Sequence, residues 1–141
     1  MRVLGIDYGR RRIGLALSDP TGLLARPWKT IAGHTSIGRA ADALEAEIAR
    51  LRAEDDGLDA VVIGWPRRLS GEANDQTAAV EALAEALRHR VSVPVSLQDE
   101  RLSSREAEQQ LARRFKDWRT RKPLVDAMAA AVVLQDYLDA R

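Results

Sequence analysis

The chain has 141 residues, of which 45% are hydrophobic and 30% charged, with a formal net charge of +1 at pH 7. This length suits one domain over residues 1–141 with a single core, and the lack of cysteine excludes disulfides and thiolate metal sites. No secretory h-region or uncharged stretch of roughly 20 residues is present, so we expect a soluble, cytoplasmic protein without a membrane partner.

Apolar runs separated by turn residues predict three strands in the first third of the chain. Residues 2–7 and 12–18 are joined by a short glycine-containing turn, which is typical of a hairpin. Residues 26–31 form a third strand. Pro27 places that strand at a sheet edge, because proline cannot donate a hydrogen bond to a neighbouring strand.

Helices and strands then alternate. A helix is predicted over residues 37–51, where apolar side chains recur with helical period after a serine or threonine cap. Residues 59–64 are apolar on both faces, as central parallel strands are. A second helix contains the apolar positions between residues 80 and 91, and a fifth strand covers residues 93–98.

The C-terminal third is expected to be helical around a basic loop. A capping box, Ser103-x-x-Glu106, predicts the start of a helix. Residues 113–123 are basic and predict a loop, and a final helix over residues 124–138 is apolar all round in its first half. The order of elements predicts one α/β domain with parallel crossovers, in which ligands bind at the carboxyl ends of the strands.

Three acidic residues lie where this architecture predicts a ligand site. Asp7 ends the first strand, Glu100 follows the fifth, and Asp126 lies at the start of the last helix. A carboxylate beside a buried strand is costly unless a partner or a cation compensates its charge. We therefore predict that the three carboxylates converge as an oxygen-only site for a divalent metal.

Each acid also has a structural interpretation without metal. Asp7 can open an Asx-type turn, and Glu100 can be an exposed acid paired with Arg101. Asp126 can be favoured by the dipole of the helix that it begins.

Hard cations suit a site of this kind. The two histidines, His34 and His89, lie outside the acidic motifs, so only oxygen ligands are available. Such a site favours Mg²⁺ or Mn²⁺ over Zn²⁺. Carboxylates can hold two such ions about 3.5–4 Å apart, and we expect two here, with Asp7 bridging them.

Basic residues concentrate in loops that flank the acids. Although a charge run is often only a solvated surface, loops that meet at one edge would form a phosphate-binding rim. Gly9 would allow close approach of a nucleic-acid backbone, and the loop residues Trp65 and Trp118 could stack on unpaired bases. The basic residues predicted to contact nucleic acid are Arg10, Arg11, Arg12, Arg67, Arg68, Arg101 and Lys122.

Five segments together resemble one known family. They are Leu4-Gly5-Ile6-Asp7-Tyr8-Gly9, Ile13-Gly14-Leu15-Ala16, Val62-Ile63-Gly64-Trp65-Pro66, Gln98-Asp99-Glu100-Arg101-Leu102-Ser103-Ser104-Arg105-Glu106-Ala107, and Asp126-Ala127-Met128-Ala129-Ala130 with Leu134-Gln135. This pattern resembles the YqgF (RuvX) family of the ribonuclease H-like superfamily. The resemblance implies a five-stranded mixed sheet in the order 3-2-1-4-5 flanked by helices. It also implies a nuclease whose catalytic and metal-binding acids are Asp7, Glu100 and Asp126.

The resemblance implies two alternative substrates. One is the 5′ end of the small-subunit (pre-16S) ribosomal RNA precursor, which we favour, and the other is the Holliday junction. Junction resolution needs a symmetric dimer, so the expected state is a monomer or a homodimer. The loop over residues 64–71 departs from the family's usual pattern.

Two other classes of protein remain as rivals. Actin-like ATPases and sugar kinases share the Asp-x-Gly opening but need a second domain, for which 141 residues leave no room. A non-catalytic RNA-binding module would keep the fold without cleavage, but it would not need all three acids.

Overall fold

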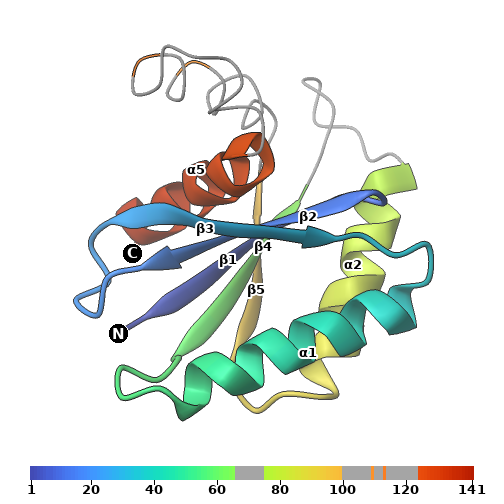
Figure 1. Cartoon of the computed structure of the whole chain (residues 1–141), viewed down its shortest axis with the longest axis horizontal. Helices are drawn as coiled ribbons and strands as arrows, with labels where there is room; N and C mark the ends of the chain where they lie inside the picture. Colours follow the sequence, from blue (N-terminus) through green and yellow to red (C-terminus); the bar gives the residue numbers. More distant parts are fainter. Residues whose placement is uncertain (66–74, 100–108, 110–112, 114–123) are drawn as a thin grey trace.

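The computed structural model describes residues 1–65, 75–99, 109, 113 and 124–141. Within that part, a mixed sheet has the strand order β3-β2-β1-β4-β5 (Figure 1). Its strands are β1 (Val3–Tyr8), β2 (Arg12–Ser18), β3 (Ala25–Ala32), β4 (Ala60–Trp65) and β5 (Val95–Asp99). Its helices are α1 (Ile37–Ala53), α2 (Asp75–Arg88) and α5 (Val125–Asp139). The predicted mixed sheet with this strand order is confirmed.

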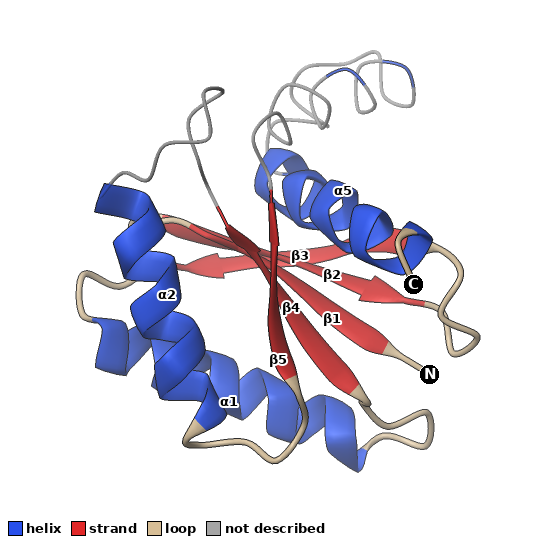
Figure 2. Cartoon of the chain, turned by 180° about the vertical axis from the view of Figure 1, so that it is seen from behind, coloured by secondary structure: helices blue, strands red, loops and turns tan. Residues whose placement is uncertain are grey.

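Antiparallel and parallel pairing divide the sheet as the sequence predicts. β1 pairs antiparallel with β2, and β2 pairs antiparallel with β3, which lies at one edge. β4 pairs parallel with both β1 and β5. The carboxyl ends of β1, β4 and β5 therefore face the same side of the domain, from which α5 begins (Figure 2).

Helices cover both faces of the sheet and divide the core into two clusters. α1 and α2 pack on one face, where Leu4, Ile6 and Tyr8 of β1 contribute to the larger cluster. α5 packs on the other face against small residues. A Cβ at Gly5 would lie 2.8 Å from the Cβ of Leu134, so glycine is what allows α5 to approach β1.

The predicted helix boundaries are close to those observed. Ser36 is the N-cap of α1, and its hydroxyl accepts a hydrogen bond from the amide of Arg39 at 3.4 Å. α5 is buried continuously from Ala127 to Leu134, as its apolar sequence predicts. Arg113 is helical rather than part of a loop. The rest of the predicted loop, residues 114–123, and the helix predicted from Ser103 lie outside the described residues.

No helix in the described ranges is both long enough and apolar enough to cross a membrane.

Candidate metal and nucleic-acid site

Asp7 lies one residue before the end of β1 and faces the α5 side of the sheet. Side chains alternate along a strand, and Ile6 and Tyr8 belong to the cluster under α1 and α2. Asp7 therefore shares a face with Gly5, which contacts α5. Its cross-strand partner on β2 is Gly14.

The first turn of α5 passes directly over Gly14. A Cβ at position 14 would lie 1.9 Å from the carbonyl oxygen of Asp126 and 2.8 Å from the amide nitrogen of Ala127. Directly opposite residues of an antiparallel pair have their Cα atoms about 4.5–5.5 Å apart. The structure thus brings Asp7 and Asp126 to the same face of the same sheet edge, although they are far apart in sequence.

Asp126 forms an ion pair with Arg12, the first residue of β2. The Nε of Arg12 donates to Oδ2 of Asp126 at 2.7 Å. Asp126 belongs to the first turn of α5, whose N-cap residue, Leu124, makes no side-chain cap hydrogen bond. Both the helix dipole and the guanidinium therefore stabilise the negative charge of this carboxylate.

The edge beside Asp7 continues across the parallel strands. Ile6 is level with Ile63 of β4, and Trp65 of β4 is level with Asp99 of β5. Asp99 is the last residue of β5, and Glu100 follows it in the sequence. Of the predicted site residues, Glu100, Arg67, Arg68, Arg101 and Lys122 lie outside the described residues, so their roles stay predictions.

The turn between β1 and β2 carries the remaining predicted contacts. Arg10 and Arg11 are exposed, and neither has an ion-pair partner within the described ranges. A Cβ at Gly9 would lie 2.6 Å from the carbonyl oxygen of Arg12. Gly9 is therefore required by the turn itself, and its predicted contact with nucleic acid stays a prediction beside that structural role.

Gly33, the residue directly after β3, contacts the backbone of the same turn. Its amide donates to the carbonyl of Arg11 at 2.8 Å, and a Cβ at this position would lie 2.4 Å from the carbonyl oxygen of Arg10. The backbone of the turn that carries the three arginines is therefore held in place by Gly33.

Two site-adjacent residues were not identified from the sequence. The Nε2 of Gln76, on α2, donates to the carbonyl of Tyr8 at 2.8 Å and so supports the end of β1. Thr30 pairs with Gly14, and its buried hydroxyl has no hydrogen-bond partner within the described part of the chain. Neither residue belongs to an acidic or basic motif, and strand register, which sequence alone does not fix, is the signal that places Thr30 here.

The prediction that Trp65 lies on a loop is wrong. It is the last residue of β4 and is partly buried against the larger core cluster. Its Nε1 donates to Oε1 of Glu81 at 3.1 Å, so the indole supports α2, and its stacking on bases stays a prediction. Trp118 lies outside the described residues.

The donor set fits a hard divalent cation. Asp7 and Asp126 supply carboxylate oxygens, and a cationic group of the chain itself, Arg12, already lies against one of them. Within the described ranges, no group of three or more acidic or histidine side chains forms a complete metal cluster. The third predicted ligand, Glu100, is outside those ranges.

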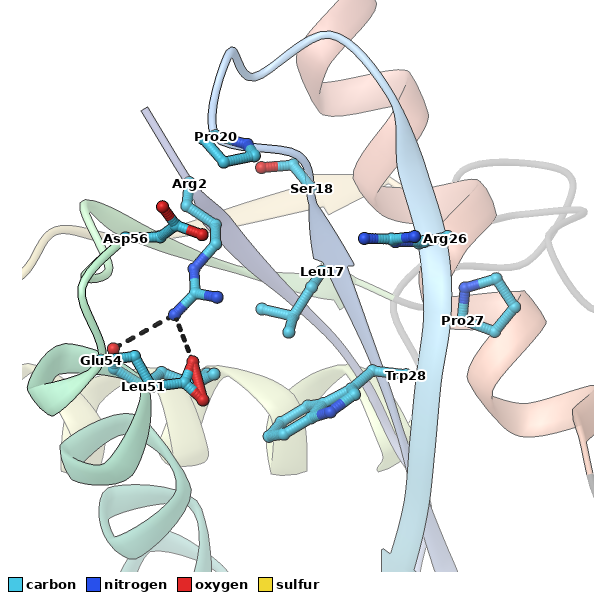
Figure 3. A pocket seen from close by; sticks show the side chains of 10 residues that line it. All are labelled: Arg2, Leu17, Ser18, Pro20, Arg26, Pro27, Trp28, Leu51, Glu54 and Asp56. Atoms are coloured by element: carbon cyan, nitrogen blue, oxygen red, sulfur yellow. Dashed lines mark hydrogen bonds and ion pairs between the residues drawn. The ribbon is translucent and has the colours of Figure 1, made fainter.

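A cavity of about 430 Å³ lies at the opposite end of the sheet (Figure 3). Arg2 lines it, but its guanidinium donates to the carbonyl of Leu51 at 3.1 Å and to the carboxylate of Glu54 at 2.9 Å. Arg2 and Glu54 meet at the C-terminal end of α1 and neutralise each other. The cavity is distant from Asp7 and Asp126.

Comparison with known proteins shows which family the sequence matches. A family model described as "RuvX: Holliday junction resolvase" matches residues 1–140. A protein of Geobacillus kaustophilus named "Putative pre-16S rRNA nuclease" is 41% identical over 143 residues, covering 100% of this chain and 99% of its own length.

Solved structures share the fold at low sequence identity. RuvC of Thermus thermophilus, in complex with a Holliday junction substrate, matches with a TM-score of 0.53 and 21% identity, covering 100% of this chain and 95% of its own. The Holliday junction resolvase of fowlpox virus matches with a TM-score of 0.58 and 12% identity, covering 99% of both chains. At these identities the likeness shows the fold alone.

Proposed function

Because the chain belongs to the RuvX family, we propose that it is a divalent-metal-dependent nuclease that cleaves the ribosomal RNA precursor. Membership of this family makes the chain a hydrolytic nuclease acting on nucleic acid. The observation that supports the metal site is the approach of Asp126 to Asp7 across Gly14. Carboxylates on one face of a sheet edge match the oxygen ligands that Mg²⁺ and Mn²⁺ prefer.

The proposed site uses Asp7, Glu100 and Asp126 to hold two ions. When bound, such ions provide a nucleophile at neutral pH, orient the phosphate and stabilise the leaving oxygen. The chain's own groups perform the rest of the work. Asp7 and Asp126 hold their oxygens on the α5 side of β1, and the exposed arginines of the turn at residues 10–12 attract and orient the phosphates.

The RNA role is supported by the name of the Geobacillus relative, which matches over the full length of both chains. The alternative is resolution of four-way DNA junctions, which is supported by the description of the family model. A resolvase requires two copies related by a two-fold axis, so the alternative also predicts a dimer. Measuring the mass of the protein in solution therefore helps to separate the two.

Cleavage of labelled substrates tests the proposal. The full chain is incubated with a 16S precursor RNA carrying its 5′ leader and with a four-way DNA junction, each with Mg²⁺, with Mn²⁺ or with EDTA. We expect metal-dependent cleavage of the RNA that yields 5′-phosphate and 3′-hydroxyl ends. Cleavage of the junction alone would favour the resolvase, and binding without cleavage of either substrate would favour the non-catalytic module.

Matched variants assign the activity to the site. Asp7→Asn and Asp126→Asn should each lower the rate at least about 100-fold, because even groups that only support metal ligands contribute about 10–100-fold. Asp42→Asn is the control, since Asp42 is 69% exposed on α1 and pairs with Arg90. Equal activity in all three variants would contradict the assignment.

A further inference from the structure

The ion pair of Arg12 and Asp126 lies at the edge where the proposed cations bind. The Nε to Oδ2 distance is 2.7 Å, and the side chains are 65% and 27% exposed, respectively. The guanidinium therefore lies on the solvent side of a carboxylate that is itself largely covered. The guanidinium of Arg12 therefore lies at an oxygen of Asp126 for which a bound cation would compete.

The two partners differ in how firmly they are held. Asp126 is fixed because its backbone packs on Gly14 within the first turn of α5. Only the backbone of Arg12 is fixed, by pairing with Ala32 and by contact of its carbonyl with Gly9. Ion pairs with an exposed partner contribute little to stability. The side chain of Arg12 can therefore leave at low energetic cost.

We propose that Arg12 exchanges partners: without a divalent cation it neutralises Asp126, and when a cation binds it leaves Asp126 and contacts a phosphate of the nucleic acid. This inference rests on the metal site of the proposed function. The physical reason is charge. A carboxylate beside Asp7 needs a compensating positive group, and a bound cation supplies that charge and repels the guanidinium. Phosphate is then the nearest anion of suitable geometry, because guanidinium binds it in a bidentate way.

Arg11 provides a matched control within the same turn. It carries the same charge, is exposed, and forms no ion pair within the described part of the chain. Removing Arg11 changes the overall electrostatic potential at the site. Removing Arg12 changes this potential too, and it also removes the group that competes with a cation for Asp126. The difference between the two variants isolates the exchange.

Arginine NMR observes the exchange directly on the full-length protein without nucleic acid. The ¹⁵Nε–¹Hε signal of Arg12 should be protected from solvent exchange in EDTA. Saturation with Mg²⁺ should shift this signal and accelerate its exchange, while the signal of Arg11 remains in place. Bound Mn²⁺, measured by electron paramagnetic resonance, gives the affinity. Arg12→Ala should bind Mn²⁺ about two- to fivefold more tightly, as expected for loss of one weak ion pair, and Arg11→Ala should change it less.

Phosphate contact has a separate readout, the salt dependence of RNA binding. With Ca²⁺, under conditions in which electrophoresis shows the RNA intact, Arg12→Ala should lower the slope of log affinity against log salt by about 0.7–0.9, as for one lost phosphate contact. In EDTA the same substitution should leave the slope unchanged. An equal decrease under both conditions would overturn the exchange.

The outcomes separate this inference from the proposed function. If Mn²⁺ binds in a manner that Asp7→Asn abolishes but the Arg12 signal does not respond to Mg²⁺, the exchange is wrong and the metal site stands. If Arg11→Ala and Arg12→Ala tighten Mn²⁺ binding equally, only the overall electrostatic potential matters and the exchange is again wrong. If wild type binds no Mn²⁺, both proposals fall.

Discussion

Gly14 lies directly opposite Asp7 on the neighbouring strand, and it is the residue over which the first turn of α5 passes. Any side chain at position 14 would occupy the place of the Asp126 carbonyl, which lies 1.9 Å from the Cβ position. The absence of a side chain at position 14 therefore allows Asp126 to lie close to Asp7. A residue without a functional group determines the geometry of the proposed site.

Gly14→Ala should impair both folding and cleavage. The added methyl group meets backbone atoms, which cannot rotate away, so α5 must shift. We expect the free energy of unfolding in urea to fall by about 1–3 kcal/mol, the usual cost of overpacking. We also expect kcat/KM to fall about 100-fold, because a displacement of about 1 Å in a catalytic group has that effect.

Gly38→Ala is the control for this substitution. Gly38 lies in α1, and the nearest atom to its Cβ position is the hydroxyl oxygen of Ser36 at 3.6 Å, an ordinary contact. Alanine there should raise the free energy of unfolding by about 0.5–1 kcal/mol. Wild-type stability and activity in Gly14→Ala would show that α5 does not depend on this contact.

Metal binding should be visible as thermal stabilisation in the absence of substrate. A ligand at 100 times its Kd stabilises the folded state by about 2.7 kcal/mol, which corresponds to a rise in Tm of roughly 5–10 °C for a chain of this size. Scanning calorimetry with Mn²⁺ should show this rise in wild type and Asp42→Asn. It should be largely absent in Asp7→Asn; an equal rise in all three proteins would place the ion elsewhere.

The strands could be predicted because their apolar runs are short and bounded by turn residues. The observed start of a strand differs from the predicted one where a residue lacks the backbone amide that pairing needs. The fifth strand was predicted from residue 93, but β5 begins at Val95. Pro94 accepts a hydrogen bond from the amide of Val61 at 2.9 Å and cannot donate one, so regular pairing starts one residue later. The strand order came from the family resemblance rather than from the pattern of residues.

The acids could be predicted, but the contacts that connect them could not. Strand ends that meet at one edge of a parallel sheet predict Asp7 near a ligand site. The angle at which α5 crosses the sheet is instead set by packing, such as that of Leu134 on Gly5. The pairing of Arg12 with Asp126 and the contact of Asp126 with Gly14 depend on that angle. No local pattern in the sequence encodes it.

Arg2 stabilises the end of α1, remote from the site, and its removal should affect stability without affecting chemistry. It is 9% exposed, and its guanidinium donates to the carbonyls of Gly57 and Leu51 at 2.7 and 3.1 Å and to Glu54 at 2.9 Å. Arg2→Ala removes these three hydrogen bonds and leaves the carbonyl of Leu51 with the amide of Glu54 alone, so the free energy of unfolding should fall by about 2–4 kcal/mol. Urea unfolding measures this loss. The value of kcat/KM, measured at a temperature well below Tm, should be unchanged. Arg26→Ala, an exposed residue of the same cavity, should stay within about 0.5 kcal/mol of wild type.

Asp19 orders the turn between β2 and β3, and we expect its contribution to disappear in acid. Its carboxylate accepts hydrogen bonds from the amides of Leu24, Leu23 and Thr21 at 2.8, 2.9 and 3.1 Å, and from the hydroxyl of Thr21. These bonds, first the one from the Leu24 amide, hold the pKa of Asp19 well below its ordinary value of 3.8. A carboxyl group whose pKa is depressed by folding stabilises the folded state above its unfolded pKa, and the stabilisation is lost as pH falls towards the folded value.

Asp19→Asn should therefore differ most from wild type above about pH 4, with the difference shrinking as the pH falls to about 2. Urea unfolding across this range gives the difference in free energy, and hydrogen exchange of the Leu23 and Leu24 amides gives the local loss of protection. Asp55→Asn is the control, because Asp55 is exposed and accepts no hydrogen bond within the described ranges. A difference between Asp19→Asn and wild type that stays constant from pH 6 to pH 2 would mean that the charge of Asp19 does not order this turn.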